Sequence, residues 1–214
     1  MKEMFKVTLS LVIIFIVAGL IMAFVFTQTA PVVKIAKERE ETAARKKMMP
    51  DADEIKEAGV WHTPEGKSGK YFECKKGGQP IGYLISTLGK GYSSYINILV
   101  SVSNDLKINA IKILGHGETP GLGDEIDQAY FQKRFEGKTL DKLVVEKIEG
   151  SEKIQAISGA TISSRAVTKG VRDAVTELTA KYGGGAVSNA PQAEGHGTEH
   201  GTDPHAEQNK EVKK

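Results

Sequence analysis

Three short glycine-containing segments carry the residues best suited to chemistry. The most informative, residues 158–164, has the sequence Ser-Gly-Ala-Thr-Ile-Ser-Ser and stands directly before a helical pattern. The amino terminus of a helix presents unpaired N–H groups and the positive end of the helix dipole, and small residues there let an anion such as a phosphate group approach closely. Arg165 and Lys169 lie within the next two turns. The simpler interpretation of this segment alone is capping of the helix by Ser163 or Ser164.

The second segment, residues 118–123, has the sequence Glu-Thr-Pro-Gly-Leu-Gly and predicts a rigid turn. Pro120 fixes its own φ, and the flanking glycines allow positive φ and close backbone approach, so the loop can lie flat against a planar ligand. It can also be no more than a tight connection before a helix predicted over residues 127–135. The third segment, residues 89–96, contains Tyr92 and leads into a strand.

Several kinds of chemistry find little support in the remaining residues. Net charge is +2 and no basic stripe is interleaved with aromatic residues, which argues against a nucleic-acid partner. Cys74 is the single cysteine, so no internal disulfide can form, and we interpret it as a half-buried strand residue. The chain has no recognisable Ser/His/Asp signature of a hydrolase. Three histidines lie in a polar tail where no fixed geometry holds a metal: His196, His200 and His205.

Periodicity predicts an α+β domain with a central antiparallel sheet and flanking helices. Strands are expected at 70–75 and 80–87 around the turn Gly77-Gly78, at 95–103, at 106–114 with a bulge near 110–111, and at 143–148. Strand 95–103 alternates cleanly, and we place its hairpin with 106–114 at the centre of the sheet. An apolar stripe at three- and four-residue spacing predicts a helix over 163–181.

The amino-terminal region predicts a membrane anchor. Residues 7–26 carry no charge and, as a helix, span about 30 Å, the thickness of the hydrocarbon core. A cleaved signal peptide is the alternative, but the run is longer than a typical signal core and no clear cleavage site follows it. We therefore expect five parts: a short tail (1–6), a transmembrane helix (7–26), a juxtamembrane helix over 32–48 with its linker (27–58), the folded domain (59–182) and a disordered tail (183–214).

Taken in order, the three glycine segments resemble one family. They are similar to the FMN-binding subunits of ion-translocating electron-transport complexes: the G subunit of the Rnf complex, a ferredoxin:NAD oxidoreductase, and the related C subunit of the sodium-pumping NADH:quinone reductase. The resemblance covers roughly residues 1–182, and its most specific parts are the Glu118–Gly123 and Ser158–Thr161 segments. The chain is short for the quinone-reductase homologue, so we prefer the Rnf protein and keep the quinone-reductase protein as the alternative.

The resemblance implies a site. In this family the motif threonine, here Thr161, is esterified by the phosphate of FMN, and a separate flavin transferase installs the cofactor from FAD. The rest of the implied cofactor site is the motif around that threonine, the second loop and one tyrosine: Ser158, Gly159, Ala160, Ser163, Glu118, Thr119, Pro120, Gly121, Leu122, Gly123 and Tyr92. Gln155 departs from the family pattern, which often has an aspartate there. His116 is interpreted as a surface-loop residue rather than a flavin contact.

The function that this implies is electron transfer within a membrane complex. The expected partners are the other subunits, the lipid bilayer and, during maturation, the transferase. The distribution of Lys and Arg around the anchor favours a cytoplasmic domain, whereas the resemblance implies the extracytoplasmic side of the cell (inner) membrane, which we adopt. Two other functions stay open: a membrane-tethered sensor that binds its flavin non-covalently, and a scaffold without a cofactor.

Overall fold

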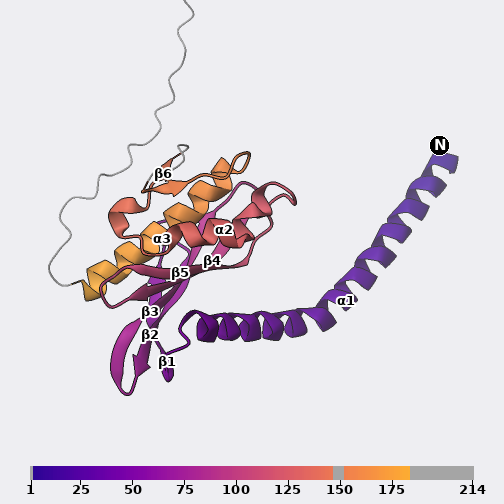
Figure 1. Cartoon of the computed structure of the whole chain (residues 1–214). Helices are drawn as coiled ribbons and strands as arrows, with labels where there is room; N and C mark the ends of the chain where they lie inside the picture. Colours follow the sequence, from indigo (N-terminus) through magenta and orange to yellow (C-terminus); the bar gives the residue numbers. More distant parts are fainter. Residues whose placement is uncertain (1, 147–151, 184–214) are drawn as a thin grey trace, which may run out of the picture.

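A computed structural model describes residues 2–146 and 152–183, so the tail that contains His196, His200 and His205 lies outside the described residues. A long helix leads into a five-stranded antiparallel sheet, and short helices, a two-stranded ribbon and a final helix follow (Figure 1). The α+β class with an apolar amino-terminal helix is confirmed. The elements are α1 (Lys2–Met48), β1 (Glu54–His62), β2 (Ser68–Lys76), β3 (Gln79–Lys90), β4 (Tyr95–Ser103), β5 (Ile108–Gly115), η1 (Gly123–Asp127), α2 (Ala129–Gln132), η2 (Lys133–Phe135), η3 (Leu140–Lys142), β6 (Val145–Glu146), β7 (Ile154–Gln155) and α3 (Thr161–Tyr182).

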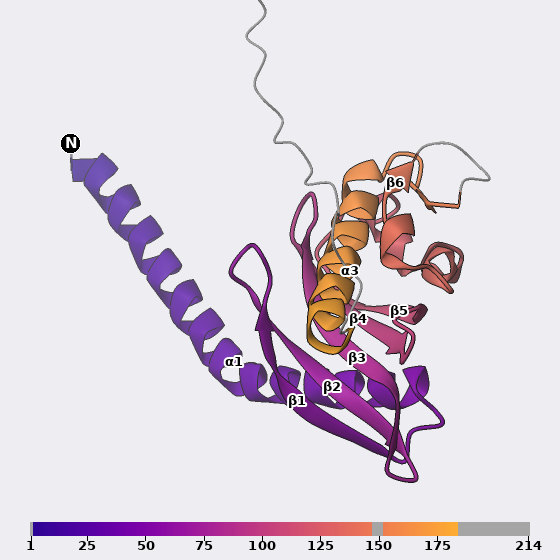
Figure 2. The same cartoon turned by 90° about the vertical axis from the view of Figure 1, so that its left-hand side faces the viewer.

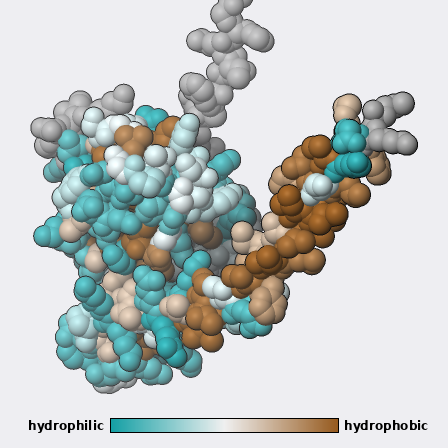
Figure 3. Space-filling model, turned by 90° about the vertical axis from the view of Figure 1, so that its right-hand side faces the viewer, coloured by the Kyte–Doolittle hydropathy of each residue, from teal (hydrophilic) through white to brown (hydrophobic). Residues whose placement is uncertain are grey.

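The amino-terminal helix α1 is continuous from the anchor into the domain. The sequence predicts two helices over 7–26 and 32–48, but the structure joins them into one helix of 47 residues with Pro31 inside it. A proline within a helix removes one backbone hydrogen bond and bends it without necessarily ending it, and Figures 1 and 2 show α1 bent along its length. Its projecting part is long and apolar enough to cross a membrane and carries a hydrophobic surface (Figure 3).

The sheet is a meander in which each strand pairs with its neighbour in sequence. The predicted turn between β2 and β3 is confirmed, with Gly77 and Gly78 both at positive φ, as a two-residue hairpin turn requires. Strand β4 has the predicted bounds, and a register shift at Ser101/Val102 places a bulge within a residue or two of the predicted one. The β4–β5 hairpin, however, forms an edge of the sheet, and β3 occupies its centre.

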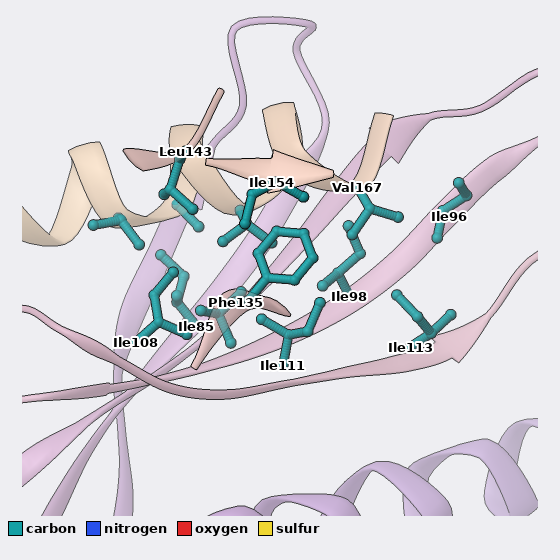
Figure 4. Close-up of a cluster of buried hydrophobic side chains, with 14 of the residues drawn as sticks. Ile85, Ile96, Ile98, Ile108, Ile111, Ile113, Phe135, Leu143, Ile154 and Val167 are labelled. Carbon is teal, nitrogen blue, oxygen red and sulfur yellow. The ribbon is translucent and has the colours of Figure 1, made fainter. Parts of the chain in front are cut away.

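Two apolar clusters cover the two faces of the sheet. The larger cluster joins the α3 stripe to the inner side of the strands, including Ile96, Ile98, Val100 and Val102 of β4 on one face as predicted, and Phe135 lies among them (Figure 4). On the opposite face, Leu84 and Leu99 pack with Met49, and the end of α1 lies against them (Figure 2). The last turn of the membrane helix is therefore part of the core of the domain.

Three elements differ from the sequence prediction. Strand β1 is not predicted, because it is a mostly exposed edge strand without an apolar alternation; only Trp61 is buried in it. The helix expected over 127–135 is split into η1, α2 and η2, although Phe131 and Phe135 are both buried as one face of it. The strand expected at 143–148 is limited to Val145–Glu146 among the described residues, where it pairs in parallel with β7.

Candidate functional site

The amino end of α3 has free hydrogen-bonding capacity. The helix begins at Thr161, and its first backbone bond runs from the N–H of Ser164 to the carbonyl of Ala160, so the N–H groups of 161–163 have no partner within the helix. The prediction that Ser163 or Ser164 caps this end is wrong, because both hydroxyls are used elsewhere: Ser163 donates to Glu118 and Ser164 to Ala160. Within the described residues, the Thr161 hydroxyl has no hydrogen-bond partner.

Thr161 lies on the wall of a pocket of about 710 Å³. This volume falls within the range of about 300–1,000 Å³ typical of small-molecule sites. Two of the predicted segments meet there, the Ser158–Thr161 motif and the tip of the Glu118 loop, although they are far apart in sequence. The lining consists of Gly121, Leu122, Glu125, Tyr130, Arg134, Gln155, Ala156, Ile157, Ser158, Gly159 and Thr161.

Glu118 does not line the pocket, but its hydrogen bonds connect the segments next to it. The residue is 5% exposed, and its carboxylate accepts hydrogen bonds from the backbone N–H groups of residues 92–94 at 3.0–3.1 Å and from the Ser163 hydroxyl at 2.5 Å. Burial by itself raises the pKa of Glu118, but the bonds from Ser163 and from the three N–H groups lower it more, so the net pKa lies below its ordinary value. One carboxylate thus joins the second loop, the segment before β4 and α3.

The glycines around this carboxylate are explained by close packing. A Cβ at Gly123 would overlap Glu118, and a Cβ at Gly89 would overlap the backbone carbonyl of Ala166 in α3. The glycine segment before β4 therefore serves the contact between α3 and the sheet. Tyr92, whose side chain is 74% exposed, contributes its backbone N–H to Glu118 and does not line the pocket. Five other predicted site residues are also absent from the pocket lining: Thr119, Pro120, Gly123, Ala160 and Ser163.

The positive charge of the pocket comes from a residue that the sequence patterns do not single out. Arg134 lines the pocket, whereas Arg165 is exposed and lies outside the lining, and Lys169 forms ion pairs with Glu65 and Asp173. Of the two cations that the sequence places in the first two turns of α3, Lys169 is thus paired with carboxylates and Arg165 is exposed to solvent. A usable signal was present in the sequence, since Tyr130 and Arg134 share one face of the predicted helix at a spacing of four residues.

His116 has a structural role at the base of the second loop. Its Nδ1 accepts the N–H of Glu118 at 3.1 Å, and its Nε2 lies 3.0 Å from a carboxylate oxygen of Asp127. The neutral ring therefore carries its proton on Nε2 and donates it to Asp127. His116 does not line the pocket, and its side chain is 11% exposed rather than free at the surface. Cys74 is also more enclosed than predicted: it is fully buried in β2, and burial raises its pKa to about 11, with a further contribution from Glu73.

The pocket fits a flavin mononucleotide. Leu122 offers an apolar side chain that is about half exposed, as a planar ring requires, and Gly121 and Gly159 keep the walls free of side chains at positive φ. The unpaired N–H groups at the start of α3 and the guanidinium of Arg134 suit a phosphate. The Thr161 hydroxyl lies on the wall of the pocket and has no hydrogen-bond partner among the described residues.

A match to a known family covers much of the part of the chain that forms this pocket. The FMN-binding domain family matches residues 91–176, which include the Glu118 loop, Arg134 and the start of α3. The fold and site thus define a flavin-binding domain joined to a helix that is long enough to cross a membrane. A solved structure, that of the C subunit of the Na(+)-translocating NADH-quinone reductase from Parabacteroides distasonis, is 27% identical and overlaps with a TM-score of 0.45, covering 55% of this chain and 63% of that one.

Two relatives extend the comparison over most of the chain. The G subunit of the proton-translocating ferredoxin:NAD(+) oxidoreductase complex of Clostridium ljungdahlii is 35% identical over 184 residues, which cover 86% of this chain and 96% of the relative. The G subunit of the Na(+)-translocating ferredoxin:NAD(+) oxidoreductase complex of Acetobacterium woodii is 33% identical, and the match covers 79% of this chain and 89% of that relative. The chain belongs to the family of G subunits of the ion-translocating Rnf complexes, and it is associated with a membrane.

Proposed function

We propose that this chain is an electron-carrying subunit of an ion-translocating ferredoxin:NAD oxidoreductase complex, with FMN attached covalently through its phosphate to the Thr161 hydroxyl. One observation supports the attachment above all. Within the described residues, the hydroxyl of Thr161 has no hydrogen-bond partner, and it lies at the amino end of α3 on the wall of a flavin-sized pocket. Ser163 and Ser164, the other hydroxyls at this helix end, are both occupied by hydrogen bonds.

The proposed attachment is a phosphoryl transfer from FAD, catalysed by a separate flavin transferase. The oxygen of Thr161 forms a bond to the phosphorus that carries the riboflavin part, the pyrophosphate bond of FAD breaks, AMP leaves and the hydroxyl proton is lost to solvent or to the transferase. The resulting ester keeps one negative charge beside the α3 dipole, where such charge is stabilised. Thr161 is therefore an attachment point and has no role in turnover.

The protein's own residues bind and orient the cofactor. Bound FMN supplies the electron transfer, while the domain determines its position and electrostatic surroundings. Leu122 and the backbone of the second loop would hold the ring, and Glu118 keeps that loop fixed to α3 through Ser163. Partners in this role are the other subunits of the complex, which donate and receive the electron. We further propose that the domain lies on the extracytoplasmic side of the cell (inner) membrane.

Attachment is tested by expressing the full chain with a flavin transferase and viewing the denatured protein on a gel under ultraviolet light. Three variants accompany the parent: Thr161→Val, which removes the hydroxyl but keeps the shape; Thr161→Ser, which keeps a hydroxyl; and Thr176→Val, which makes the same change at an exposed threonine of α3 outside the pocket lining. We expect fluorescence in the parent and in Thr176→Val and none in Thr161→Val. The intact mass of the parent should exceed that of Thr161→Val by one esterified FMN, after correction for the substitution.

Results that differ from this expectation would each indicate a different function or attachment residue. A parent that is yellow in its native state but loses its colour on denaturation would favour a non-covalent flavin module. A parent that is colourless in both states, expressed beside a transferase that modifies a control substrate, would favour a scaffold. Fluorescence that survives in Thr161→Val would move the attachment to another residue. Thr161→Ser reports whether the transferase requires threonine itself.

A further inference from the structure

Arg134 stands out among the charged residues of the pocket because it has no ion-pair partner in the part of the chain that the structure describes. Among the described residues, no carboxylate lies within ion-pair distance of its guanidinium, whereas Lys169, Lys142 and Lys153 each form an ion pair with a carboxylate. The acidic residue that shares the pocket, Glu125, accepts the hydroxyl of Tyr130 at 2.7 Å. Arg134 is thus a half-buried cation without an ion-pair partner among the described residues, although the Glu125 carboxylate lines the same pocket.

The guanidinium is also held in place before any ligand binds. Its Nη1 donates to the backbone carbonyl of Gln155 at 2.5 Å, and its central carbon lies 5.2 Å from the centre of the Tyr130 ring, within the range of a cation–π contact. Tyr130 is in turn fixed by its bond to Glu125. These contacts use one of the five N–H donors of the guanidinium and leave others for a ligand.

The core determines the direction in which Arg134 points. Phe131 and Phe135 are fully buried and pack edge to face at 5.5 Å, and they directly follow Tyr130 and Arg134 along the α2–η2 segment. Residues four apart lie on one face of a helical segment and adjacent residues are about 100° apart, so burial of the two rings places Tyr130 and Arg134 on the adjoining side, where the pocket lies. The segment therefore presents its cation to the pocket as a consequence of its packing.

We propose that Arg134 binds the phosphate of the flavin and makes the site selective for a phosphorylated flavin over riboflavin. This inference rests on the proposed FMN function and adds a recognition residue to it. An arginine in a partly buried site forms directed, charge-assisted hydrogen bonds to phosphate oxygens, which a neutral ribityl chain cannot replace. The same residue would attract the phosphorylated flavin before the ester with Thr161 forms.

Binding without the covalent link separates recognition from attachment. The full chain carrying Thr161→Val is purified in detergent, and its affinities for FMN and for riboflavin are measured by quenching of flavin fluorescence. Arg134→Gln is added and compared with Lys133→Gln, an exposed neighbour with the same change of charge that does not line the pocket. We expect Arg134→Gln to weaken FMN binding roughly ten- to hundredfold, as loss of a charge-assisted bond does, without changing riboflavin binding.

The controls distinguish failure of this inference from failure of the proposed function. Two results would overturn the role of Arg134 while the attachment at Thr161 stands. One is an unchanged FMN affinity in Arg134→Gln. The other is an equal loss of affinity for FMN and riboflavin in both Arg134→Gln and Arg134→Lys, the second of which keeps the positive charge. If Thr161→Val binds neither flavin, the yield of covalent flavin is compared between Arg134→Gln and Lys133→Gln in chains that keep Thr161. Equal yields overturn the inference. A lower yield in Arg134→Gln alone supports it. A parent that never acquires flavin would overturn both proposals.

Discussion

Replacing Glu118 should damage the fold as well as the site. In Glu118→Ala, four donors lose their shared acceptor: the N–H groups of residues 92–94 and the hydroxyl of Ser163. A buried donor left unsatisfied costs about 1–3 kcal/mol, so four of them set an upper range of about 4–12 kcal/mol. Water can reach residues 92–94, which lie near the surface, and we therefore expect a loss of about 4 kcal/mol, a large part of the about 5–15 kcal/mol typical of a domain.

Glu118→Gln should have a smaller effect of predictable origin. The amide keeps one oxygen, which can still accept the N–H groups of Ser93 and Ser94, but its NH₂ group faces the N–H of Tyr92 and the hydroxyl of Ser163. The Ser163 hydroxyl can turn to accept from the amide, so the bond from the Tyr92 N–H is the one that is lost, for an expected cost of about 1–3 kcal/mol. The exposed Glu136→Gln is the matched control and should change stability by less than about 0.5 kcal/mol.

The assay is urea unfolding of the full chain in detergent, followed by the fluorescence of Trp61. This is the single tryptophan of the chain, and it is 4% exposed in the domain core, so it reports unfolding of the domain. Because the folded pKa of Glu118 lies below its ordinary value, its contribution is complete above the unfolded pKa and is lost as the pH falls through the folded one. The parent should therefore lose stability on acidification more steeply than Glu118→Gln. An unfolding midpoint of Glu118→Ala equal to that of the parent would refute this account of Glu118.

Three further predictions follow from the packing and from the anchor. Gly89→Ala should separate α3 from β3 and cost about 2 kcal/mol or more, whereas Gly115→Ala, with open space around it, should be nearly neutral; urea midpoints of the two variants test this. Phe135→Ala should cost about 3–5 kcal/mol by the same assay and also lower flavin yield by releasing Arg134, and normal yield would contradict that link. Two fusions after the last residue test the topology: a phosphatase that is active only outside the cytoplasm and a fluorescent protein that fluoresces only inside it. We expect activity from the phosphatase fusion, and fluorescence without phosphatase activity would reverse the proposed topology.

Local patterns predicted those parts of the fold whose side chains follow one regular period. The alternation of β4 and the apolar stripe of α3 are visible in sequence because each element buries a whole face. Strand β1 buries only Trp61 and is held by pairing with β2, so its own residues carry no alternation. The length of α1 was underestimated because Pro31 lies inside the helix and does not end it.

The site was predictable only in part, for a different physical reason. The resemblance carried by the three glycine segments pointed to Thr161 and the Leu122 loop, which the structure places on one pocket. The role of Glu118 depends on donors about 25 residues earlier and 45 residues later in the chain, which no local pattern reveals. Arg134 reaches the pocket because Phe131 and Phe135 orient its segment, and the spacing of the four residues contains that information once the segment is recognised as helical.

The continuity of α1 determines how the proposed flavin can travel. Met48 and Met49, at the end of the helix, are packed into the sheet, and residues 32–48 extend about 25 Å at 1.5 Å per residue. A domain joined to the membrane by a flexible linker could take many orientations, but here residues 32–48 form a helix that packs directly against the domain. Any change in the tilt of residues 32–48 then turns the redox centre through the same angle. Electron exchange with neighbouring subunits should accordingly depend on rocking of this arm, and a glycine-rich insertion after Met48 would uncouple the two movements.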